Sequence, residues 1–150
     1  MLFRSVIILT INRITCIFTS VFCVFQSWSV PKTSNEFTLQ WRRKKSLEDK
    51  KLYVQHIITA ENGPQILKAI FKSEIPFGLL GELAKILNSE RDNYSKNLLH
   101  DTLQCLSETG RFSMSLTFLS SDEKGALQKL IDYLVSGGLD CTDLKTGYLL

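Results

Sequence analysis

Residues suited to metal binding or redox chemistry are scarce in this sequence. The four cysteines among its 150 residues are Cys16, Cys23, Cys105 and Cys141. No two of them have the two-residue spacing that is typical of zinc ligands or of a redox dithiol. The two histidines, His56 and His100, do not lie at a metal-binding spacing from another histidine, a cysteine or a pair of carboxylates. We therefore predict no metal and no cofactor, and the cysteine pattern favours a reduced, cytoplasmic protein.

The sequence also lacks a recognisable catalytic motif. Cys105, His100 and Asp101 could be combined on paper as nucleophile and base, but residues five apart on a helix point about 140° apart. Gly78 and Gly81 lie in an apolar stretch that reads as helix, without the lysine and hydroxyl that follow a phosphate-binding loop. We interpret these glycines as positions of close helix approach. The prediction is that the protein is not an enzyme.

The excess of basic residues that nucleic-acid binding requires is missing from most of the chain. The formal net charge is +3, but Arg4 and Arg13 lie in an opening segment without acidic residues. Without these two, 16 of the 18 basic residues remain against 15 acidic ones, so residues 31–150 carry +1. No nucleic-acid partner is expected from this balance. The basic cluster of residues 42–51 is interrupted by two acidic residues, and we interpret it as a solvated helix end.

Charge is nearly absent from residues 1–29, an apolar leader that differs in composition from the rest of the chain. The leader loosely matches a signal peptide, with Arg13, an apolar run and the small residues Ser27 and Ser29. Its uncharged stretch extends for only about 13 residues, short of the roughly 20 that a bilayer-spanning helix needs. The interpretation that we favour is an alternative first exon or a gene-prediction artefact, joined to a domain that begins near Val30.

From Pro31 onward, apolar residues recur three and four positions apart, which indicates a series of amphipathic helices. Polar caps, Gly and Pro separate these helices, and no strand or hairpin pattern competes. The sequence predicts an all-α fold over residues 30–136, a compact bundle or short superhelix of about seven helices. A flexible tail is expected over residues 137–150, and Gly110 is expected to be a left-handed C-cap. In chain order, the expected helices carry Phe37 and Trp41; Leu52, Tyr53, Ile57 and Ile58; Ile66, Leu67, Ile70 and Phe71; Leu79, Leu80, Leu83, Ile86 and Leu87; Leu98, Leu99, Leu103 and Leu106; Phe112 to Leu119; and Ala126, Leu127, Leu130, Ile131 and Leu134.

Polar residues that precede these apolar patterns predict where several helices begin. Thr33 with Glu36, and Ser120 with Glu123, have the spacing of a capping box, in which a hydroxyl and a carboxylate each accept from a free backbone N–H. Ser46, or a residue just after it, is expected to begin the second helix.

The short helix expected at residues 112–119 carries two separate stripes. Phe112, Leu116 and Leu119 form one stripe, and Arg111, Met114 and Phe118 form the other. If the first stripe fills the core, the second is left at the surface as an aromatic, a thioether and a cation, which are side chains that interfaces favour. In the alternative interpretation, Met114 and Phe118 are core residues and Arg111 is a lone surface charge.

A resemblance to a known family runs from about residue 30 to residue 136. Residues Arg111-Phe112, Met114, Phe118-Leu119-Ser120, Glu123-Lys124 and the span from Leu127 to Leu134 resemble the closing signature of the RNA polymerase II-associated protein 3 C-terminal domain family. Residues 31–41 resemble its entry helix. Relatives of that family include sperm-associated antigen 1 and a coiled-coil protein of ciliary dynein-arm assembly.

The resemblance implies a helical interaction domain that docks onto RuvB-like AAA+ ATPases, in a heat-shock protein 90 co-chaperone or dynein-arm assembly context. It also implies that Arg111, Met114 and Phe118 contact the ATPase. The chain has no tetratricopeptide repeats, so it would not by itself hold a chaperone tail. The alternative function is a membrane-tethered helical protein that is anchored by residues 1–29, with the basic cluster at the lipid surface.

Overall fold

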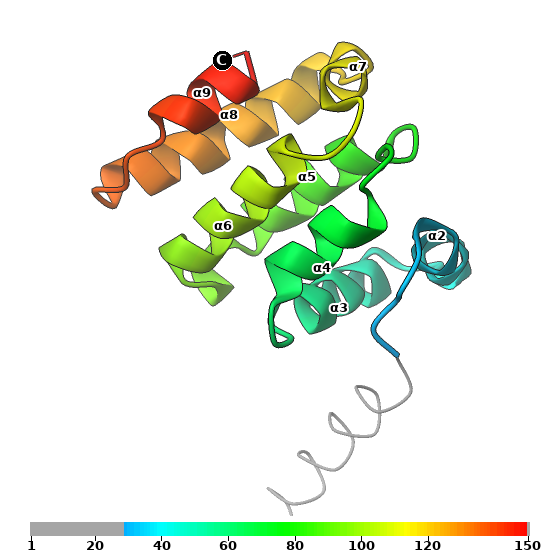
Figure 1. The fold of residues 1–150 in the computed structure, drawn as a ribbon. Helices are drawn as coiled ribbons and strands as arrows, with labels where there is room; N and C mark the ends of the chain where they lie inside the picture. The colour runs from blue at the N-terminus through cyan, green and yellow to red at the C-terminus, as the bar shows by residue number, and fades with distance from the viewer. Residues whose placement is uncertain (1–28, 150) are drawn as a thin grey trace, which may run out of the picture. The chain divides into compact units, whose positions relative to one another are not determined.

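The structure is a computed structural model that describes residues 29–149 of the chain (Figure 1). Within this range every regular element is a helix, and no strand occurs. The elements are α2 (Ser34–Arg43), α3 (Leu47–Ile58), α4 (Gly63–Ile70), α5 (Leu79–Ser89), the 3₁₀ turn η1 (Arg91–Asn93), α6 (Lys96–Ser107), α7 (Phe112–Thr117), α8 (Ser121–Ser136) and α9 (Thr142–Gly147). The predicted all-α class is confirmed.

The three interpretations of the leader concern residues that, except for Ser29, lie outside the described part of the chain. No helix between residues 29 and 149 has the length and apolar character that crossing a bilayer requires.

Hydroxyl caps set the start of four helices. The Thr33, Ser46 and Ser95 hydroxyls accept from the N–H groups of Glu36, Asp49 and Leu98, at 3.2, 3.0 and 3.2 Å. At the start of α8 the capping box is complete, because Ser120 Oγ accepts from Glu123 N–H and Glu123 Oε2 accepts from Ser120 N–H. Each such cap stabilises the protein by about 0.5–2 kcal/mol.

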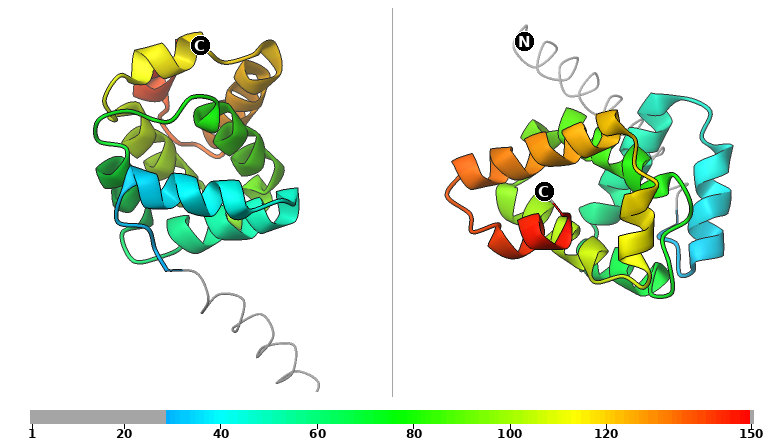
Figure 2. Two further views of the ribbon diagram at one scale, coloured as in Figure 1. Left: turned by 90° about the vertical axis from the view of Figure 1, so that its right-hand side faces the viewer. Right: turned by 90° about the horizontal axis from the view of Figure 1, so that it is seen from above.

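Successive helices pack across the molecule, from α2 and α3 at one end to α8 and α9 at the other (Figures 1 and 2). Helix α4 packs on α3 and on α6, α5 packs on α8, and α6 also contacts α8 and α9. At the α2 end, Phe37 stacks with Trp41 and contacts the rings of Tyr53 and Phe71, with centroids 5.1–5.5 Å apart. This aromatic cluster anchors α2 on the rest of the bundle.

Two glycine predictions were wrong. Gly78 lies before α5 as its N-cap, with φ = +78°, and not inside the helix. Gly110 is not a left-handed C-cap, because the left-handed residue at this turn is Arg111, with φ = +54°. Gly110 instead donates its N–H to the carbonyl of Lys72 at 3.0 Å, and a Cβ at this position would collide with the backbone carbonyl of Ser73. At Gly81 a Cβ would meet the Glu123 carboxylate, so what approaches this glycine closely is a side chain of α8.

The end of the chain differs from the expected flexible tail. Residues 142–147 form α9, so the described residues contain eight α-helices where about seven were predicted. Leu144 and Tyr148 are buried, and the Tyr148 hydroxyl donates to the carbonyl of Leu103 at 2.9 Å. The Tyr148 ring also packs edge-to-face on Phe112, with centroids 4.9 Å apart. The last helix therefore belongs to the core, and Tyr148, at its end, contacts Phe112 of α7.

Candidate protein-interaction site

Helix α7 has one buried face and one exposed face. Phe112, Leu116 and Leu119 are buried. Met114 and Phe118, on the other face, are 54% and 56% exposed. The interpretation of these two residues as core is therefore wrong, and the second stripe lies at the surface. Large apolar side chains that stay exposed beside one another on a short helix are candidates for contact with another protein.

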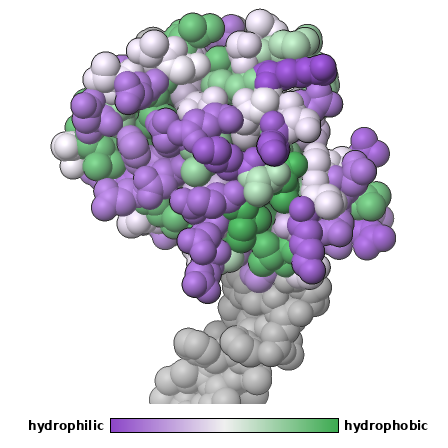
Figure 3. Space-filling model, in the orientation of Figure 1, coloured by the Kyte–Doolittle hydropathy of each residue, from purple (hydrophilic) through white to green (hydrophobic). Residues whose placement is uncertain are grey.

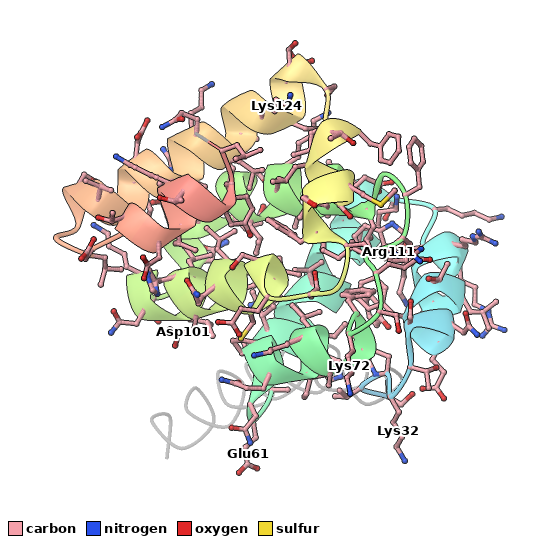
Figure 4. All side chains as sticks on the ribbon, turned by 45° about the horizontal axis from the view of Figure 1, so that its top comes forward. Lys32, Glu61, Lys72, Asp101, Arg111 and Lys124 are labelled. Carbon is pink, nitrogen blue, oxygen red and sulfur yellow. The ribbon has the colours of Figure 1, made fainter. Side chains whose placement is uncertain are left out.

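Arg111 lies at the start of α7, facing the segment that leads into α5 (Figure 4). Its Nη1 donates to Glu74 Oε2 at 3.2 Å, and both side chains are exposed. An exposed pair of this kind contributes little to stability, about 0–1 kcal/mol. Its effect is to direct the Arg111 guanidinium toward the segment that contains Glu74.

Phe77 is a member of this surface that the sequence analysis missed. It lies in the connection between α4 and α5 and is 81% exposed. Its ring meets the Phe118 ring edge-to-face, with centroids 5.0 Å apart. Helical periodicity could not identify Phe77, because it lies outside every helix. The available signal was an aromatic residue placed between Pro76 and Gly78, a combination typical of an exposed turn.

The two segments that carry these side chains form a shallow cleft of about 160 Å³. Glu74 and Phe77 line it from one segment, and Arg111, Met114 and Phe118 line it from the other. The hydrogen bond from Gly110 N–H to the Lys72 carbonyl joins the two segments at their base. We call the surface formed by these five side chains the α7 ridge. The face of the molecule in Figure 3 is mostly hydrophilic, with hydrophobic residues gathered in a few places.

Cys105, His100 and Asp101, the catalytic combination considered in the sequence analysis, all lie on α6. Between residues 29 and 149 no three His, Cys, Asp or Glu side chains are placed to hold a metal ion. Burial raises the pKa of the Cys105 thiol, which keeps it protonated and opposes nucleophilic attack. His100 Nδ1 lies 3.5 Å from the neighbouring Asp101 carboxylate, so this pair is formed within α6. The α7 ridge consists of three exposed apolar side chains beside the Arg111–Glu74 ion pair, a composition that is suited to recognition.

Residues 30–124 match the protein family described as the potential Monad-binding region of RPAP3, which is RNA polymerase II-associated protein 3. The chain belongs to this RPAP3 C-terminal domain family. The solved C-terminal domain of human RPAP3 has the same fold, with a TM-score of 0.70 and 25% sequence identity over 81% of this chain and 90% of that domain. The resemblance read from residues 111–134 is thereby confirmed, and the RPAP3 C-terminal family is one of protein-interaction domains.

The chain is also similar to proteins named dynein axonemal assembly factor 19. The zebrafish (Danio rerio) protein is 32% identical over 115 residues, which cover 77% of this chain and 45% of that protein. The Mus musculus protein is 34% identical over 104 residues, covering 69% of this chain and 42% of the relative. The Xenopus tropicalis protein is 32% identical over 109 residues, covering 73% and 46%. This chain thus matches less than half the length of each of these relatives.

Proposed function

We propose that this chain is an adaptor that docks onto a RuvB-like AAA+ ATPase, in a heat-shock protein 90 co-chaperone or dynein-arm assembly context. The observation that supports this proposal most is the exposure of Met114 and Phe118 beside Arg111, the three residues that the family resemblance implies as contacts. The names of the relatives, dynein axonemal assembly factors, support the assembly context.

In the proposed complex, each residue of the α7 ridge has a distinct role. Phe118 and Phe77 together present one aromatic edge to the partner, and Met114 fills the space beside it with a flexible thioether. Arg111 exchanges its exposed carboxylate partner, Glu74, for a carboxylate of the ATPase. Exchange of one exposed ion pair for a desolvated one favours specificity more than affinity. Most of the binding energy therefore comes from the two aromatic rings.

The first test is Phe118→Ala in the full chain, measured as affinity for purified RuvB-like ATPases. Truncation of a central aromatic anchor should cost about 2 kcal/mol or more, which is a roughly 30-fold weaker Kd. Val135→Ala is the matched control, because Val135 is also an exposed apolar residue but lies near the end of α8. The control should bind like the wild type, and all three proteins should have the same circular dichroism spectrum.

The description of the family as a potential Monad-binding region names a second partner to assay. Purified Monad is therefore tested beside the ATPases with the same three proteins. Capture of the ATPase that is lost in Phe118→Ala supports the proposal. Capture of Monad alone through Phe118 would show that the site is right and the ATPase assignment is wrong. Unchanged ATPase affinity of a folded Phe118→Ala protein would refute the role given to the α7 ridge.

A further inference from the structure

A second cleft, of about 470 Å³, borders the α7 ridge at Phe77. Helix α2 supplies one wall, and the connection into α5 supplies the other. Its apolar lining includes Phe37, Trp41 and Leu79, which are buried core residues. Pro76 and Phe77 line both clefts, so the second cleft is continuous with the α7 ridge.

One basic side chain of this cleft, Lys50, is already paired with an acidic one, Glu82. Glu82 Oε2 lies 2.5 Å from Lys50 Nζ and accepts from Trp41 Nε1 at 3.2 Å. Lys50 Nζ also lies 4.9 Å from the centroid of the Trp41 ring. These three side chains form a closed network, so Lys50 is occupied within the molecule and is not the group that would attract a ligand.

The uncompensated charge is at the end of α2. Arg42 lines the cleft, and Arg43 and Lys45 follow it with exposed side chains. None of the three forms an ion pair with a carboxylate anywhere in residues 29–149. The neighbouring Lys51, by contrast, is paired with Glu48 at 3.0 Å and with Glu90 at 2.9 Å. Arg42 is therefore an unpaired cation on the lining of this mixed polar and apolar cleft, and Arg43 and Lys45 lie close to it in the chain.

We propose that this second cleft binds an acidic peptide segment that carries one apolar side chain. The apolar side chain enters between α2 and Phe77, and the carboxylates meet Arg42 and Arg43. Because Phe77 lies between the two clefts, the segment is assigned to the same partner that covers the α7 ridge. That assignment rests on the proposed function, whereas the binding of an acidic peptide does not.

Two other classes of anionic ligand match the cleft less well. A flat lipid surface would not enter a recess between α2 and the α5 connection. Single-stranded nucleic acid is held by stacking on exposed aromatic faces, but Trp41 is buried and only Phe77 is available here. A short acidic peptide matches both the concavity and the small number of free cations.

The test measures fluorescence anisotropy of a labelled ten-residue peptide of Asp and Glu with one central Leu, titrated with the full chain. The test variant is R42E/R43E. The matched control is K124E/K129E, which makes the same charge change at two exposed lysines of α8. We expect saturable binding to the wild type and to the control, and about tenfold or greater weakening in R42E/R43E. The Asn/Gln version of the peptide should not bind.

Equal weakening in both charge-reversal variants would overturn the proposal, because binding would then follow net charge alone. Tighter binding of a uridine oligonucleotide, or of vesicles with 30% phosphatidylserine, would overturn it in favour of those ligands. Phe118→Ala separates this proposal from the proposed function. Peptide binding retained in Phe118→Ala while ATPase capture is lost supports two distinct clefts. If the wild type captures the ATPase but does not bind the peptide, the proposed role of the second cleft is refuted and the proposed function is not.

Discussion

Tyr148 provides a sharp test of whether the end of the chain belongs to the core. Its side chain is 3% exposed, its hydroxyl donates to the Leu103 carbonyl at 2.9 Å, and its ring packs edge-to-face on Phe112. Tyr148→Phe removes the hydrogen bond but keeps the ring, so it should lower the free energy of unfolding by about 1 kcal/mol. Tyr148→Ala also leaves a cavity beside Phe112, and it should cost about 3–5 kcal/mol.

Urea unfolding of the full chain, followed by circular dichroism, measures both changes. Tyr133→Phe is the control, because Tyr133 is half-buried and its hydroxyl has no hydrogen bond within the described residues. Its effect should be less than about 0.5 kcal/mol. A loss below about 1 kcal/mol in Tyr148→Ala would refute the reasoning, since a buried aromatic cannot be removed from a packed core at that cost.

Three further substitutions test other parts of the structure. Gly125→Ala should raise the free energy of unfolding by about 0.5–1 kcal/mol, because Gly125 lies inside α8 with open space where a Cβ would stand. Gly110→Ala should instead lower the free energy of unfolding by about 1–3 kcal/mol, because the new Cβ collides with the Ser73 carbonyl. Thermal unfolding measures both glycine variants, and a change of the melting temperature in the same direction for both would contradict this account. Glu123→Gln should lower the free energy of unfolding most at pH 7, and less as the pH falls below the ordinary glutamate pKa near 4.3. The reason is that the Ser120 N–H lowers the pKa of Glu123 in the folded state, so the carboxylate stabilises the fold only while it is ionised. Thermal unfolding of wild type and Glu123→Gln at pH 7 and pH 3 checks this, and an equal difference at both values would assign the effect to shape and not to charge.

Local signals were enough to predict most of the helices. The hydroxyl caps at Thr33, Ser46 and Ser120 act over three residues, so the sequence alone reveals them. The apolar spacing likewise separated the two stripes of α7, but it could not decide which stripe is buried. One long-range contact that favours burial of Phe112 comes from Tyr148, which lies far along the chain.

The features that sequence reasoning missed depend on contacts between distant segments. Gly110 is required by the Lys72 and Ser73 carbonyls, and nothing in the sequence around residue 110 indicates that approach. Phe77 becomes part of the α7 ridge only because the loop before α5 lies against Phe118. Helix α9 is short and polar in composition, and its place in the core depends on two buried residues, Leu144 and Tyr148. Neither propensity nor periodicity includes such long-range contacts.

The hydrogen bond between Gly110 and Lys72 has a consequence for the design of inhibitors. Helix α7 has only six residues, and a peptide of that length would not hold a helix in water. It would also lack Phe77, which lies more than thirty positions earlier and is brought beside Phe118 by the fold. A synthetic mimic of α7 alone should therefore compete poorly with the whole protein. An effective competitor would have to link residues 72–78 to residues 110–118, for instance in one cyclic scaffold that reproduces this backbone hydrogen bond.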